Sequence, residues 1–214
     1  MLTWGKLILS FIHFVPMLLI SLVLFRIRVK PYWKQISLAV LASSMLTLYM
    51  DTPIILVCTI CILLMFVWKY QFVPALFIAI SGYIMAALVS TLVIVCVNFT
   101  QAEAYIDIKD DLLISIVTRC LILAAKCGFL LALYKLRLGF TFISNYTKIP
   151  LGKENVGIYL YIIVAVIGMV YRNAFRDHVF SAVMPIQMLS MAIVLFLYVM
   201  LSKEFGLHCR STRG

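Results

Sequence analysis

Long apolar segments separated by short polar ones cover almost the whole chain. A helix needs about 20 apolar residues to cross a bilayer. Seven runs approach or exceed that length: Leu7 to Phe25, Ile36 to Met50, Pro53 to Trp68, Phe72 to Val97, Leu112 to Tyr134, Val156 to Tyr171 and Val179 to Ser202. This pattern predicts an all-α fold, a polytopic membrane bundle of about seven transmembrane helices over residues 1–203, followed by a short basic cytoplasmic tail over residues 204–214.

The second and third runs leave one alternative open. They are short, and only Asp51 and Thr52 separate them, so they could form a re-entrant hairpin in a bundle of six spans. The first run follows Lys6 without a small-residue cleavage site, which favours a retained helix over a signal peptide.

The composition agrees with a membrane protein. The chain is 65% hydrophobic and 12% charged, whereas soluble domains are about half apolar and about a quarter charged. The net charge of +10 is better explained by basic cytoplasmic loops, which also attract anionic lipid headgroups, than by nucleic acid. We therefore expect a multi-pass protein of the cell membrane whose partner is the lipid bilayer.

The distribution of lysine and arginine predicts the orientation. With the N-terminus outside and the C-terminus inside, seven spans place twelve basic residues in cytoplasmic segments and four in outer segments. Six of the eight acidic residues fall outside. Cytoplasmic loops carry the excess of basic residues in membrane proteins, so we predict an N-out, C-in bundle.

The sequence contains none of the common catalytic or metal-binding motifs. It has no H-E-x-x-H, no G-x-S-x-G and no Gly-rich phosphate loop. Cys58 and Cys61 are spaced as C-x-x-C, but they lie inside an apolar run and no second pair follows. The histidines are far apart, at positions 13, 178 and 208. We expect neither an enzyme nor a site for a metal or a cofactor.

Two cations inside the fifth run are the candidate site. Arg119 and Lys126 are seven residues apart, which places them on one face of a helix. A cation at the centre of a membrane costs at least about 2.5–3.5 kcal/mol, so the pair indicates a polar interior, an anionic partner such as Asp51, or the carboxylate of a ligand. In the alternative interpretation, both side chains extend along their stems toward the headgroups.

Small and hydroxyl residues recur in the second and fourth runs. They are Ser43, Ser44 and Thr47 in one run, and Ser81, Gly82, Ser90 and Thr91 in the other. Such residues let membrane helices approach closely and bond across their interface. They favour helix packing over a pathway for solutes.

Several segments are similar to those of a known family. The fifth run has Ile114 to Leu123, with its basic residue, and ends in Tyr134-Lys135-Leu136-Arg137. A basic inner loop leads to Ile149-Pro150, and the last run ends in Leu201-Ser202-Lys203-Glu204. With the N-out bundle of six or seven spans, these features resemble the transmembrane sensor region of bacterial peptide-pheromone histidine kinases of the GHKL type.

The resemblance implies a receptor of a two-component signal-transduction system. The expected function is to bind an extracellular peptide or a small amphiphile and to signal to the cytoplasm, with a homodimer as a further partner. The family's phosphoacceptor helix and ATP-binding domain are absent from this sequence, so the expected module is a sensor without a kinase. The alternative is the substrate-binding membrane subunit of a vitamin-type importer, in which Arg119 and Lys126 would hold an anionic solute. A membrane scaffold without a ligand is a third hypothesis.

Overall fold

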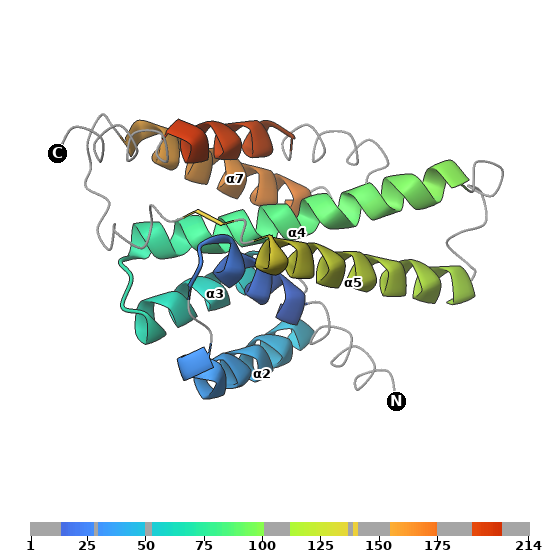
Figure 1. Cartoon of the computed structure of the whole chain (residues 1–214), viewed down its shortest axis with the longest axis horizontal. Helices are drawn as coiled ribbons and strands as arrows, with labels where there is room; N and C mark the ends of the chain where they lie inside the picture. The colour runs from blue at the N-terminus through green and yellow to red at the C-terminus, as the bar shows by residue number, and fades with distance from the viewer. Residues whose placement is uncertain are drawn as a thin grey trace.

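A computed structural model of the chain describes residues 14–27, 30–49, 53–100, 112–136, 139–140, 155–174 and 190–202. Within these ranges the fold is all-α (Figure 1). The elements are the first helix (Phe14–Leu24), the 3-10 turn η1 (Lys30–Tyr32), α2 (Trp33–Tyr49), α3 (Pro53–Val67), α4 (Phe72–Thr100), α5 (Leu112–Lys135), α7 (Val156–Ala174) and the last helix (Ser190–Ser202).

Each of these helices coincides with one of the predicted apolar runs, with small shifts at the ends. α2 begins at Trp33, three residues before the predicted Ile36. The turn η1 contains Pro31, whose fixed φ suits the first turn of a helix, so the helical region starts earlier than the apolar pattern alone suggests. Residues 7–13 and 179–189 of the predicted first and last runs lie outside the described ranges.

Two helices in the described part are long and apolar enough to cross a membrane, over Phe72–Val97 of α4 and Val117–Lys135 of α5. Four further apolar helices are shorter, over Phe14–Leu24, Ile54–Val67, Val156–Tyr171 and Ser190–Ser202. The two long helices are compatible with a membrane protein. The count of seven spans stays a prediction.

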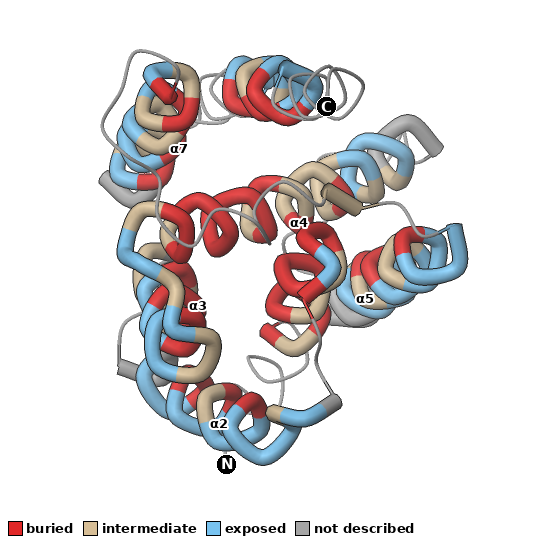
Figure 2. Tube along the Cα trace, turned by 60° about the vertical axis from the view of Figure 1, so that its left-hand side comes forward, coloured by how far each residue is buried: buried red, intermediate tan, exposed pale blue. Residues whose placement is uncertain are grey.

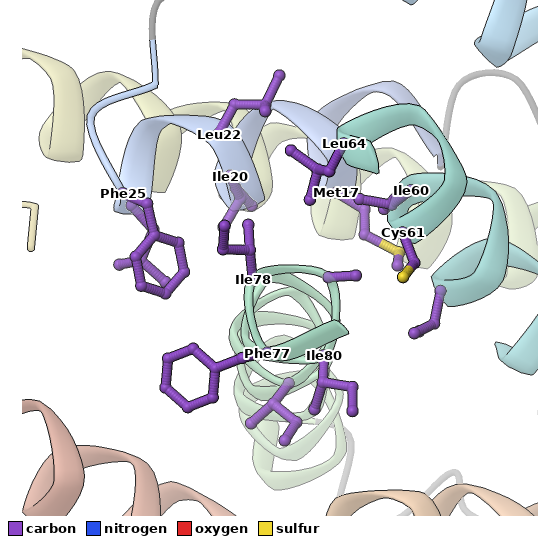
Figure 3. Close-up of a cluster of buried hydrophobic side chains, with 14 of the residues drawn as sticks. Met17, Ile20, Leu22, Phe25, Ile60, Cys61, Leu64, Phe77, Ile78 and Ile80 are labelled. Carbon is purple, nitrogen blue, oxygen red and sulfur yellow. The ribbon is translucent and has the colours of Figure 1, made fainter. Parts of the chain in front are cut away.

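α4 is the central element of the fold. Around its first turns, residues 77–82 are buried without interruption, on every side of the helix (Figure 2). A helix that is buried all round must pack against neighbours on more than one face. Figure 3 shows how this happens: Ile78 points from α4 toward Ile20 of the first helix, Phe77 projects from another side of α4, and Met17 and Leu64 belong to the same core.

Aromatic rings join α4 to the C-terminal pair of helices. The ring of Phe77 lies 5.2 Å from Tyr161 of α7 and 6.4 Å from Phe196 of the last helix, measured between ring centroids. Phe25, at the end of the first helix, completes the cluster at 5.9 Å from Phe77. Edge-to-face and tilted pairs at these distances add to the free energy of burial. The cluster therefore connects both faces of α4 within one core.

The first helix and α4 cross at very short range. A Cβ atom added to Gly82 would lie 2.5 Å from the Cβ of Ser21 and 2.8 Å from its Cα. Real carbon atoms pack at about 3.5–4.0 Å. Only glycine fits at position 82, and its missing side chain is what allows the two backbones to approach.

Neighbouring helices alternate in direction, so that particular ends meet (Figure 1). The backbone N–H of Phe140, just beyond α5, donates to the carbonyl of Leu24 at the end of the first helix, at 2.8 Å. The ring of Tyr32, just before α2, lies 5.1 Å from that of Trp68, just after α3. Four exposed cations belong to these ends: Arg26, Lys34, Lys69 and Lys135. We call this side of the molecule the basic end. The sequence count assigned all four residues to one side of the membrane.

Two of these cations have an unusual backbone conformation. Arg26 has a φ of 51° and Lys69 a φ of 56°. The first helix ends in a Schellman motif, in which Ile27 donates to the carbonyl of Leu22 and Arg26 donates to that of Val23. Helices that end in this way usually place glycine at the left-handed position, because other residues cost roughly 1–2 kcal/mol there.

Candidate functional site

Lys126 lies in the middle of the face of α5 that packs against the rest of the protein. The buried residues of α5 are Ile122, Lys126 and Leu133, and Phe129 and Leu130 also pack against the core. Their spacing of three to four residues is that of one helix face. The opposite face exposes Leu121, Gly128 and Leu131. The spacing of the buried residues predicts an apolar side chain at position 126, but the residue there is a lysine.

The lysine is enclosed, with only 7% of its surface exposed. The burial applies to the side chain as a whole: in the described ranges the fully enclosed side-chain nitrogen and oxygen atoms without a partner are Ser43 Oγ and Trp68 Nε1, and the ammonium nitrogen of Lys126 is not one of them. Buried cations are normally paired, because the loss of hydration is costly. All eight acidic residues of the chain, Asp51 included, lie outside the described ranges.

Arg119 lies on the same helix face, two turns before Lys126. Seven residues correspond to about 10 Å along the helix axis. Unlike Lys126, Arg119 is exposed. The packed face of α5 is therefore closed at Lys126 and open at Arg119. The sequence placed both residues on one face, and the structure adds this difference in burial.

The position of Lys126 along α5 limits the alternative interpretation, in which its side chain extends along its stem to the headgroups. The basic end of α5 is at Lys135, nine residues further on, which is about 13 Å along the axis. That distance is longer than a lysine stem can cover. Arg119 is already exposed, so it needs no such reach. The two cations thus differ in how they could be neutralised.

The hydroxyl residues of the core serve mainly the helices themselves. Ser21, Ser81, Ser90 and Thr91 each donate to the backbone carbonyl four residues earlier, at 2.6–3.0 Å. Bonds of this kind satisfy a buried hydroxyl without a partner on another helix. A hydrogen bond also joins two helices, from the phenol of Tyr161 to Ser81 Oγ at 3.3 Å. These contacts support helix packing rather than a solute pathway.

Cys58 and Cys61 differ in their surroundings: Cys58 is exposed, whereas Cys61 is buried in the core. A search of the described residues finds no group of three or more His, Cys, Asp or Glu side chains that could hold a metal ion. The histidines at positions 13, 178 and 208 lie outside those residues. The candidate site therefore rests on the cations of α5.

The basic end contains a second arrangement of charged and aromatic residues that the sequence does not predict. The start of α2 and the end of α3 meet through the rings of Tyr32 and Trp68, and Lys34 and Lys69 are exposed beside them. The signal was present as two Trp-Lys dipeptides, at positions 33–34 and 68–69. Their proximity depends on the antiparallel pairing of two helices.

Comparison of the chain with protein-family models, with curated proteins and with solved structures finds no match. The resemblance to sensor regions of histidine kinases thus stays a prediction from sequence.

Proposed function

We propose that this chain is a multi-pass receptor of the cell membrane that binds the carboxylate of an extracellular peptide or small amphiphile at Lys126 and signals to the cytoplasm. The observation that carries the proposal is a lysine only 7% exposed, within a helix that is long and apolar enough to cross a membrane. A cation at that depth costs at least about 2.5–3.5 kcal/mol. A residue with a purely structural role at this position would be apolar, as Ile122 and Leu133 are on the same face.

The arrangement of α5 suggests how such a ligand would enter. The exposed Arg119 is nearer the end opposite to the basic end, which the N-out orientation places outside the cell. A carboxylate would meet Arg119 first and Lys126 about 10 Å deeper. The apolar body of the ligand would replace lipid or water along the intervening helix face. Ligand sites of this kind are mostly apolar, with few polar groups that fix orientation.

A direct test uses the reconstituted protein and two fluorescent probes, dansyl-labelled dodecanoate and the matching dodecanol. The proposal expects the carboxylate to bind and the alcohol to bind weakly. A hydrogen bond to a charged group contributes about 1.5–3 kcal/mol, so Lys126→Leu should weaken carboxylate binding about 10- to 100-fold. Lys126→Arg should retain part of it. Lys135→Gln, an exposed cation at the basic end, is the matched control and should leave binding unchanged.

The free energy of unfolding of the Lys126→Leu variant shows whether Lys126 is neutralised by a ligand or by an acidic residue of the chain. If Lys126 holds a ligand, the empty variant should be as stable as the parent protein or more stable. If an acidic residue of the chain such as Asp51 neutralises Lys126, the substitution strands that carboxylate and lowers stability by about 3–5 kcal/mol. That loss, without any effect on probe binding, would refute the proposal.

The importer subunit remains the second candidate, because a buried lysine serves an anionic solute equally well. The two functions differ in what the purified protein retains. Stoichiometric retention of a radiolabelled carboxylate vitamin, together with indifference to secreted peptides, would favour the importer.

A further inference from the structure

The corner between α2 and α3 combines two exposed lysines with an aromatic pair. We define the α2–α3 corner as Tyr32, Lys34, Trp68 and Lys69. The rings of Tyr32 and Trp68 lie 5.1 Å apart, at an interplanar angle of 61°. Lys34 and Lys69 are both exposed next to them. The aromatic contact holds the start of one helix against the end of the other, so the backbone positions of Lys34 and Lys69 lie at the same end of the two helices.

The charge of the corner is not compensated by the segments that build it. Asp51 is the only acidic residue in the first 102 positions, and it belongs to the turn at the opposite ends of α2 and α3. The first turn of α2 contains no acidic residue, and neither does that of α4. The N-terminus of α2 adds to the positive potential at the corner, whereas the C-terminal carbonyls of α3 oppose it. The two exposed lysines, with no acidic residue in the helices that carry them, make the corner suited to an anion.

Lys69 occupies a backbone position that favours glycine. Its φ is 56°, and the N–H groups of Trp68 and Tyr70 on either side both donate to the carbonyl of Leu64. Glycine would adopt this conformation without strain. A cation at the end of a helix also interacts favourably with the helix dipole. Lys69 therefore either stabilises the end of α3 through the helix dipole or binds a ligand, and an experiment can separate the two roles.

The indole of Trp68 adds an unused donor. Its Nε1 atom is enclosed and has no hydrogen-bond partner among the described residues. A buried donor without an acceptor is unfavourable. Because the Nε1 atom is enclosed, an oxygen acceptor could reach it only after a shift of the indole ring.

Beside the corner, both helices expose large apolar side chains. Phe66 of α3 is 82% exposed, and Leu38 of α2 is 71% exposed. Trp33, next to Lys34, is 60% exposed. A soluble phosphate compound would use only the lysines, whereas a phospholipid would place its phosphate at the lysines and its acyl chains along Leu38 and Phe66. The apolar surface therefore favours a lipid over a soluble anion.

We propose that the α2–α3 corner is a binding site for the headgroup of an anionic phospholipid. This inference rests on the proposed membrane bundle, because a lipid of one leaflet reaches the corner only if the helices are inserted. Lys34 and Lys69 contact the phosphate, and the Tyr32–Trp68 pair marks the depth of the headgroup region, where tryptophan and tyrosine accumulate in membrane proteins. The site distinguishes anionic from zwitterionic lipids by charge.

The test measures quenching of Trp68 by brominated lipids, in a Trp4→Phe/Trp33→Phe background that leaves Trp68 as the only tryptophan. The protein is reconstituted in phosphatidylcholine vesicles that contain a small fraction of brominated phosphatidylglycerol or, in the parallel sample, brominated phosphatidylcholine. We expect stronger quenching by the anionic lipid. Each basic residue near a membrane surface contributes roughly 1 kcal/mol of attraction, so Lys69→Gly should reduce the preference about fivefold.

Three controls make the result decisive. Lys69→Gly should unfold at the same temperature as the parent protein or at a higher one, because the substitution removes backbone strain. If Lys69 only interacts with the helix dipole, the substitution should lower the stability and leave the lipid preference unchanged. That result would overturn the proposal. Lys135→Gln, at the basic end but outside the corner, should leave quenching unchanged. Competition by inorganic phosphate in the buffer would indicate a soluble anion and would overturn a lipid site.

Alkaline extraction of the vesicles distinguishes this inference from the membrane assignment. A protein that stays in the vesicles but shows equal quenching by both lipids refutes the corner site alone. A protein that is released refutes the membrane bundle and the corner site together.

Discussion

The crossing of the first helix and α4 gives a sharp test of the fold. In Gly82→Ala, the added methyl carbon would lie 2.8 Å from the Cα of Ser21, about 1 Å closer than carbon atoms normally pack. Since a backbone atom blocks the space, no rotamer change relieves the contact, and the two helices must separate. Ile78 and its neighbours on the first helix, Met17 and Ile20, would then lose part of their packing.

Two opposing contributions determine the expected change in the free energy of unfolding of Gly82→Ala. Overpacking of a close-packed interior costs about 1–3 kcal/mol, and this site belongs to the upper part of that range because the obstacle is backbone. Alanine regains roughly 0.8–1.0 kcal/mol of helix propensity over glycine. Gly82→Ala should therefore lower the free energy of unfolding by about 1–2 kcal/mol.

Gly128 provides the matched control. It lies in the middle of α5, and a Cβ atom added there would meet nothing within 4 Å. Gly128→Ala should be neutral or should stabilise the protein by up to about 1 kcal/mol. The assay is equilibrium unfolding of both variants in mixed detergent micelles, followed by helical circular dichroism. Equal stability of the two variants would refute the close crossing of the first helix and α4.

Three further predictions concern the core, the topology and the response to pH. Tyr161→Phe should cost about 0.5–1.5 kcal/mol, because Ser81 keeps its bond to the carbonyl of Phe77, whereas Tyr161→Ala should cost about 3–5 kcal/mol; similar losses in the same unfolding assay would contradict the assigned hydrogen bond. In a background without native cysteines, a cysteine at position 105 should react with a membrane-impermeant maleimide in intact cells and one at position 148 only after permeabilisation, and the reverse pattern would overturn the N-out orientation. Burial raises the pKa of Tyr70 above its ordinary value of 10.0, so the folded state holds this phenolic proton more tightly than the unfolded chain, and the associated stability is present below pH 10 and is lost as the pH rises further. Tyr70→Phe should reduce this alkaline loss of stability, and an unchanged slope of unfolding free energy against pH would exclude the residue as its source.

The apolar pattern was sufficient to predict the described helices to within about three residues at their ends, because each helix overlaps one run of residues that lipid or core can accept. It was also sufficient to place Arg119 and Lys126 on one face, since that depends only on helical periodicity. It could not predict which of the two is buried, because burial depends on where α5 meets its neighbours. The contact of Gly82 with Ser21 and that of Tyr32 with Trp68 join residues 61 and 36 positions apart. No local pattern specifies such contacts.

The central position of α4 has a consequence for synthesis of the chain. The first helix and α3 precede α4 and share one core with it, and α2 packs on α3, whereas α7 and the last helix follow and pack through Phe77. Until α4 has left the ribosome, the earlier helices lack the element that their buried faces share. The later pair, in turn, meets a surface that is already formed. Assembly would therefore proceed in two stages separated by the emergence of one helix: the N-terminal helices pack once α4 has emerged, and the aromatic contacts of α7 and the last helix with Phe77 form afterwards.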